Sequence, residues 1–114
     1  MAKGLIGLYL YEDRVIVVPV GWGSPLCNDI DPYMIVPAVA ECVGPAIQMG
    51  FAASAAAFEN PIAKPDTPPM RRARQELRVK ITAFHHRCSL CSLMHIQDRL
   101  FLQFYNQRKR VGTG

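Results

Sequence analysis

Residues 5–20, LIGLYLYEDRVIVVPV, constrain the fold more than any other stretch of the chain. Two runs rich in aliphatic and tyrosine residues flank the acidic pair Glu12-Asp13. Strand-forming runs on both sides of a short polar turn are typical of a β-hairpin. Pro19 has no amide hydrogen to donate, so we expect it where the second strand lies at an edge of the sheet or bulges.

The middle of the chain combines a loop, a short strand and a long apolar segment. GWGSPLCND is rich in turn-forming residues, and DIDPYMIV, residues 29–36, predicts a short third strand. Pro37 suits the first turn of a helix, where Glu41 lies near the positive helix end. We therefore expect an alanine-rich helix over residues 37–58, buried against the sheet and kinked or restarted at Gly44-Pro45. The proline-rich ENPIAKPDTPP that follows predicts an irregular connection.

Residues 34–58 are also about long enough to span a bilayer. However, the segment contains Glu41 and Gln48 and is interrupted by prolines and glycines, and ionisable groups are costly at membrane depth. We therefore expect a buried helix and no membrane. The first residues, MAKGLIGLYLYEDR, lack the pattern of a signal peptide, which favours a cytoplasmic location.

The C-terminal half predicts a helix followed by strands. Arg71–Leu77 has good helix formers, whereas LRVKITA, residues 77–83, alternates as a half-buried strand does. The segments CSLMHIQ and LFLQFYNQ predict two strands joined through Asp98-Arg99. We expect residues 108–114 to form a flexible tail. The chain is thus expected to form a single α+β domain over residues 1–114. Its antiparallel sheet combines the N-terminal hairpin with the C-terminal strands and packs against the alanine-rich helix.

The stretch FHHRCSLCSLMH, residues 84–95, raises the question of a metal site. In a strand, Cys88 and Cys91 point to opposite faces, so they converge on one metal only if residues 85–91 form a knuckle or a helical turn. A structural zinc site also needs four ligands, usually from two separated pairs. We expect reduced thiols, no bound metal and no cofactor.

Catalytic constellations are equally hard to find in the sequence. Cys88 could pair with His85 or His86 as a nucleophile and base, but no orienting acid or oxyanion loop is identifiable. The glycines of GWGSP precede a strand and not a helix, so they do not resemble a phosphate-binding loop. We therefore expect no catalytic residues.

Charge is distributed unevenly along the chain. Residues 1–60 contain six acidic and two basic residues, whereas residues 61–114 contain three acidic and eleven basic ones. The halves therefore carry net charges of about −4 and +8, which predicts oppositely charged faces in the folded domain. An acidic face suggests a basic partner, and a basic face suggests nucleic acid or an acidic partner.

Four blocks in order give the chain a resemblance to a known family. They are GLYLYEDRVIVVPV, DIDPYMIVPA, NPIAKPDTP at the end of the alanine-rich segment, and AFHHRCSLCSLMHIQDRLFLQFYNQRK. Together these blocks, spanning residues 7–109, resemble the small immunity proteins of bacterial contact-dependent growth inhibition systems. The resemblance implies a protein that is not an enzyme. It would act as an antitoxin by binding the toxic C-terminal domain, often a nuclease, of its cognate delivery protein.

An inhibitor of a nuclease can present carboxylates to the basic cleft that otherwise holds phosphates. The candidate carboxylates on turn and loop segments are Glu12, Asp13, Asp29 and Asp31. The aromatic residues able to anchor an interface are Trp22 and Tyr33. The alternative hypothesis is a small nucleic-acid-binding module that uses the basic C-terminal half, with or without zinc. Its phosphate contacts would come from the arginine cluster Arg71, Arg72, Arg74 and Arg78.

Overall fold

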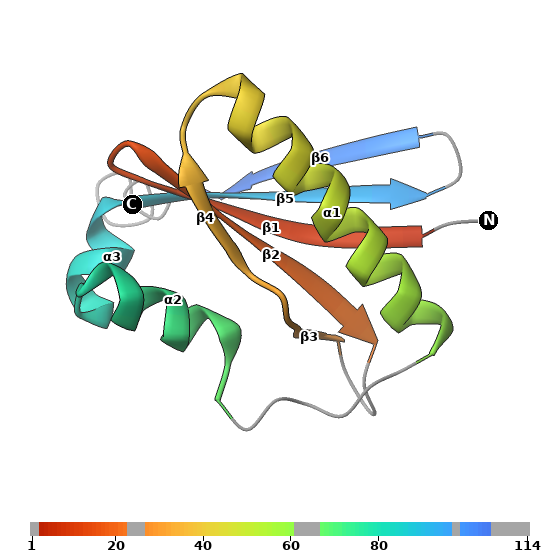
Figure 1. Cartoon of the computed structure of the whole chain (residues 1–114), viewed down its shortest axis with the longest axis horizontal. Helices are drawn as coiled ribbons and strands as arrows, with labels where there is room; N and C mark the ends of the chain where they lie inside the picture. Colours follow the sequence, from red (N-terminus) through yellow and green to blue (C-terminus); the bar gives the residue numbers. More distant parts are fainter. Residues whose placement is uncertain (1–2, 23–26, 61–66, 97–98, 106–114) are drawn as a thin grey trace, which may run out of the picture.

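The computed structural model describes residues 3–22, 27–60, 67–96 and 99–105 of the chain (Figure 1). Within these residues, six strands form one antiparallel sheet in the order β3-β2-β1-β5-β6, and β4 pairs with β2 beside β3. The elements in chain order are β1 (Lys3–Tyr11), β2 (Arg14–Trp22), β3 (Cys27–Asp29), β4 (Met34–Pro37), α1 (Ala40–Glu59), α2 (Pro69–Leu77), α3 (Ile81–Arg87), β5 (Cys88–Ile96) and β6 (Arg99–Tyr105). The predicted α+β domain with an antiparallel sheet is confirmed.

The sheet has an apolar core on each of its faces, because successive strand side chains point to opposite sides. Under α1, which crosses β1 and β2 in Figure 1, the buried residues are Ile6, Val17, Ala46 and Leu93. On the opposite face α2 and α3 cover a second buried cluster, formed by Tyr11, Ile16, Val18, Met70, Ala73, Phe84 and Cys88. Three layers result, with the sheet between α1 on one side and the pair α2 and α3 on the other.

The N-terminal hairpin has the predicted strands and turn. Tyr11 pairs with Arg14, so Glu12 and Asp13 form the two-residue turn, and Glu12 adopts a left-handed φ of 55°. In sheet order β2 is an interior strand, but β4 pairs with its residues 14–17 and β3 with its residues 20–22. Pro19 lies in the gap between these two ladders, where its missing amide hydrogen costs no strand pairing and its carbonyl accepts from Ile30.

The segment before α1 differs from the prediction. Residues 29–36 do not form one short strand: β3 ends at Asp29, and β4 begins only at Met34. Pro37 is the last residue of β4 and not part of the helix, which begins at Ala40. Residues 37–39 are therefore needed to turn the chain from the edge of the sheet onto its face.

Helix α1 is continuous through Pro45 and is not restarted there. Because Pro45 lies near the N-terminus, the carbonyl left without a helical partner is that of the exposed Glu41, which water can reach. The helix is also not buried all round. One stripe, formed by Ala46, Gly50, Ser54 and Ala57, packs against the sheet, while Gln48 and Met49 are exposed.

The expected strand over residues 77–83 is wrong. Helix α2 ends at Leu77. The C-cap residue Arg78 has a left-handed φ of 57° and donates its amide to the carbonyls of Arg74 and Gln75. A second helix, α3, follows and places Phe84, which is 1% exposed, against Tyr11 with ring centroids 5.3 Å apart. Burial of this aromatic ring outweighs the local alternation of apolar and polar residues.

The two C-terminal strands are confirmed as β5 and β6, although β5 begins at Cys88, three residues earlier than predicted. The tail, residues 108–114, lies outside the described residues. Among the described helices, none is both long and apolar enough to cross a membrane.

Candidate functional site

The acidic tip of the hairpin and the end of α2 share one hollow. Glu12 and Asp13 are exposed, and with Glu76 and Arg78 they line a surface cavity of about 310 Å³. Glu76 belongs to α2, more than sixty residues further along the chain. The cavity therefore links the predicted acidic turn to a carboxylate that the sequence did not single out.

Side chains of helix α2 also form hydrogen bonds with the segment between β3 and β4. The Tyr33 hydroxyl donates to Oε1 of Glu76 at 2.8 Å, and Nη2 of Arg72 lies 2.6 Å from both carboxylate oxygens of Asp31. The Arg72 guanidinium carbon lies 5.6 Å from the centre of the Tyr33 ring, within the range of a cation–π contact. The hydrogen bond to Glu76 raises the pKa of Tyr33, and the one to Asp31 raises the pKa of Arg72.

These contacts define one surface, termed here the polar strip: Glu12, Asp13, Glu76, Tyr33, Arg72 and Asp31. It brings together four of the six residues predicted as a binding site. Arg72 and Glu76 were missed as members, although their spacing of four residues places them on the same side of a helix and could have indicated a shared role.

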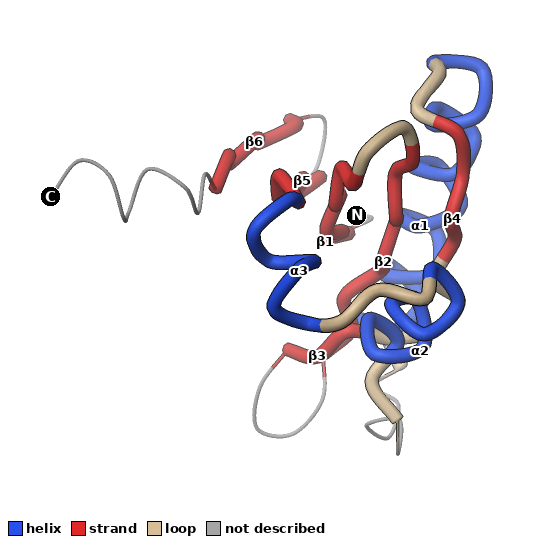
Figure 2. The backbone as a smooth tube through the Cα atoms, turned by 90° about the vertical axis from the view of Figure 1, so that its left-hand side faces the viewer, coloured by secondary structure: helices blue, strands red, loops and turns tan. Residues whose placement is uncertain are grey.

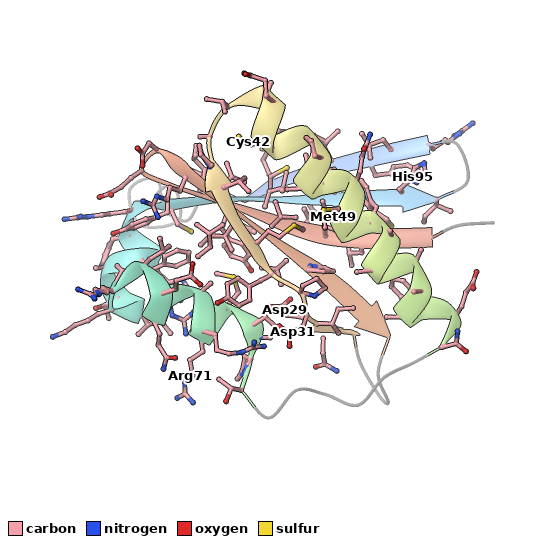
Figure 3. All side chains as sticks on the ribbon, in the orientation of Figure 1. Asp29, Asp31, Cys42, Met49, Arg71 and His95 are labelled. Carbon is pink, nitrogen blue, oxygen red and sulfur yellow. The ribbon has the colours of Figure 1, made fainter. Side chains whose placement is uncertain are left out.

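Asp29 lies beside the strip but is half-buried (Figure 3). Burial raises the pKa of its carboxyl group. Burial also raises the pKa of Tyr9 to about 12, and the nearby charge of Asp29 adds to that shift. Asp29 therefore offers less exposed charge than its place in the sequence suggested. The side chain of Trp22, the remaining predicted anchor, lies outside the described part of the structure.

The predicted separation of acidic and basic faces is not found along the polar strip. Arg72 pairs with Asp31, and Nη1 of Arg87 lies 3.6 Å from Oε2 of Glu12. Both arginines come from the basic half of the chain and both acids from the acidic half. Folding places α2 and α3 beside the hairpin tip and the β3–β4 segment, so opposite charges become neighbours.

Cys88 and Cys91 point to opposite faces of the sheet, as strand geometry predicted. Cys88 packs in the cluster beneath α2 and α3, whereas Cys91 packs in the cluster beneath α1. Burial raises the pKa of both thiols. The described residues contain no group of three side chains suited to hold a metal ion.

A second surface is apolar. Between α1 and β6 runs a groove of about 430 Å³ whose walls include Leu10, Val43, Ile47, Leu102 and Phe104. The sequence does not predict this groove, because the groove depends on α1 packing over β1, β2 and β4 and leaving β6 uncovered.

No protein-family model, curated protein or solved structure matches this chain. The resemblance to immunity proteins accordingly stays a prediction, supported by the residues that suggested it.

Proposed function

We propose that the protein is an immunity protein that acts in the bacterial cytoplasm. It would bind and neutralise the C-terminal toxin domain, a nuclease, of a cognate contact-dependent inhibition protein. The observation that carries the proposal is the polar strip, in which Glu12, Asp13 and Asp31 are exposed. Glu12 and Asp13 share a cavity with Glu76, and Glu76 accepts from the Tyr33 hydroxyl.

The strip suits a basic nuclease cleft for two physical reasons. Carboxylates complementary to a cationic cleft accelerate encounter and exclude partners of like charge. Tyr33 and Asp31 are already held by Glu76 and Arg72, so binding would cost less side-chain entropy than ordering free side chains. A partially exposed tyrosine beside charged groups is also a frequent anchor of protein interfaces.

The test is titration calorimetry with the toxin domain encoded immediately upstream, together with survival of cells that express that toxin. Reversing Glu12 and Asp13 to lysine should weaken binding at least tenfold, because close charge pairs at interfaces couple by about 1.5–7 kcal/mol. Reversal of Arg71, an exposed α2 residue outside the strip, is the matched control and should have little effect.

Asp31 needs a different design, because changing it also releases Arg72. The double swap Asp31→Arg with Arg72→Asp keeps an ion pair but exchanges the positions of its charges. If the toxin contacts the carboxylate at position 31, the double variant should bind as weakly as Asp31→Asn alone. If Asp31 only holds Arg72 of α2 in place, the double variant should bind like the wild type, and Asp31 is then not a toxin contact.

The alternative is nucleic-acid binding through the basic half of the chain. The salt dependence of binding distinguishes it from the immunity proposal. A phosphate-binding module should bind a fluorescent duplex with an affinity that falls steeply between 50 and about 200 mM salt. An immunity protein should ignore the duplex and bind only its toxin. Failure of the purified protein both to bind the toxin and to protect cells would contradict the immunity proposal.

A further inference from the structure

The last strand, β6, exposes large apolar side chains on both faces of the sheet. Leu100 is 53% exposed, Phe101 50%, Leu102 54% and Phe104 76%. Leu100, Leu102 and Phe104 face the α1 side, and Phe101 faces the other, because neighbouring strand residues alternate. Large exposed apolar side chains gathered along one strand mark an interaction site.

The edge of β6 is open in the hydrogen-bonding direction as well. In the described residues β6 pairs with β5 alone, without a bulge, from Arg99 opposite Ile96 to Tyr105 opposite Leu90. Figure 2 shows β6 at the margin of the sheet, away from α1. No other described strand pairs with its outer backbone groups, so they can pair with a strand from another molecule.

The two edges of the sheet differ in how they are protected. At the opposite edge β3 has three residues and β4 four, and Asp31-Pro32 lies between them. Short strands, charge and proline are the usual devices that prevent edge pairing. Strand β6 has seven residues and begins with the exposed Arg99, but residues 100–105 contain neither a charge nor a proline. This contrast indicates that β6 is covered when the protein is in its functional state.

We propose that a second copy of this chain covers β6, with the two β6 strands antiparallel about a two-fold axis at Gln103. A two-fold interface requires each contact to be made twice, so its surface must be complementary to itself. The sequence FLQFY, residues 101–105, is symmetrical in chemistry about Gln103. In this register Leu102 faces Phe104 of the second copy, and Gln103 faces Gln103 of the second copy.

The register is also consistent with the arrangement of the layers. Paired residues differ by an even number of positions, so side chains that face α1 in one copy meet side chains that face α1 in the other. Helix α1 packs on β1, β2 and β4, which leaves β5 and β6 between it and the new neighbour. The sheets of the two copies can therefore join without a collision between helices.

The area available predicts a weak dimer. Each of the four exposed side chains offers on the order of 100 Å², so two copies would bury at most roughly 800 Å² of apolar side-chain surface. Stable interfaces bury about 1,200–2,000 Å² in total, and the paired backbones supply part of the difference. We expect monomer and dimer to exchange as the protein concentration changes. This dimer is independent of the polar strip and of the proposed function.

Sedimentation velocity over a series of protein concentrations tests the proposal. The wild-type protein should shift from monomer to dimer, and Leu102→Lys with Phe104→Lys should weaken dimerisation at least tenfold. Met49→Lys, at a 59% exposed apolar residue of α1, is the matched control and should leave it unchanged. Circular dichroism of each variant shows whether the fold is kept. A wild-type protein that stays monomeric at every concentration would overturn the proposal, as would equal effects of the β6 and α1 variants.

The symmetry axis has a test of its own that does not depend on apolar substitutions. Because Gln103 faces itself, Gln103→Glu and Gln103→Lys should each dimerise less than the wild type, since like charges then face each other. An equimolar mixture of the two variants should form a heterodimer, because the charges are opposite. If the mixture dimerises no better than either variant alone, the two-fold register at Gln103 is wrong.

Discussion

Gly50 of α1 lies directly against Ile6 of β1. A Cβ at position 50 would come within 3.1 Å of Cγ2 of Ile6 and, at the same distance, Cγ1 of Val17. Both neighbours are fully buried and β-branched, so they have little freedom to move away. The small residues of α1 therefore allow the helix backbone to approach the sheet closely.

Gly50→Ala should accordingly destabilise the protein, although alanine is the better helix former. Without a clash the substitution would gain about 1 kcal/mol, whereas overpacking of a core typically costs about 1–3 kcal/mol. Ala52→Gly, at an exposed position of the same helix, measures the propensity effect alone and should cost about 1 kcal/mol. Urea unfolding monitored by circular dichroism compares them. A stabilising Gly50→Ala would disprove the close packing.

Ser54 should be the most important polar residue of the α1 layer. Its hydroxyl is fully buried, accepts from the Leu5 amide at 2.8 Å and donates to the Val20 carbonyl at 2.5 Å. Ser54→Ala removes both of these hydrogen bonds from a fully buried site and should lower the free energy of unfolding by roughly 1–3 kcal/mol. Ala56→Ser, on the exposed side of the helix, is the control and should change it by less than about 0.5 kcal/mol. Equal losses would show that the hydroxyl bonds add nothing.

Tyr9 should make the protein sensitive to alkaline pH. Its pKa is raised from 10.0 to about 12, first by burial and then by Asp29, so the folded state favours the neutral phenol. The contribution of the neutral Tyr9 phenol to the free energy of unfolding is therefore fully present below pH 10. It falls by roughly 2–3 kcal/mol as the pH rises towards 12. Tyr9→Phe should remove this loss, measured by urea unfolding across that range. The same alkaline loss in Tyr9→Phe would assign it to another group.

Asp29→Asn should stabilise the protein at neutral pH. Burial raises the pKa of this carboxyl group in the folded state. Its contribution to the free energy of unfolding is therefore fully present at acidic pH and is lost as the pH rises through the folded-state pKa. The advantage of asparagine should therefore be present at pH 7 and absent well below pH 3.8. The variant should also show a lower Tyr9 pKa by spectrophotometric titration, because one cause of its shift is gone. An advantage that is independent of pH would contradict this electrostatic explanation.

Cys88 and Cys91 should neither form a disulfide with each other nor share a zinc ion. In a strand, residues three apart are separated by about 10 Å and face opposite sides, beyond the reach of a disulfide. Mass spectrometry after mild oxidation should show no bridge between them. Elemental analysis of protein purified without chelators should find far less than one zinc per chain. A stoichiometric metal would require a different conformation of residues 85–91.

The sequence alone determined the elements whose pattern is local. The hairpin with its Glu12-Asp13 turn and the two C-terminal strands follow from the strand-forming composition of their own residues. The helix of residues 40–59 follows from its alanine content, though not its start, because Pro37 is equally compatible with ending a strand. Three acidic residues of the candidate site, Glu12, Asp13 and Asp31, were found in the same way because acidic residues favour turns and loops, and Tyr33 was found as an aromatic anchor.

Only the tertiary structure reveals the features that depend on contacts between residues distant in sequence. Residues 77–83 alternate like a strand, yet α3 forms because Phe84 is buried beside Tyr11. The charge asymmetry of the halves suggested separate faces, yet Arg72 and Asp31, forty-one positions apart, form an ion pair. Composition gives the net charge of each half of the chain, and periodicity indicates local secondary structure. Neither shows which residues come into contact in the folded protein. Those contacts are fixed only when the whole chain buries its apolar residues around one sheet.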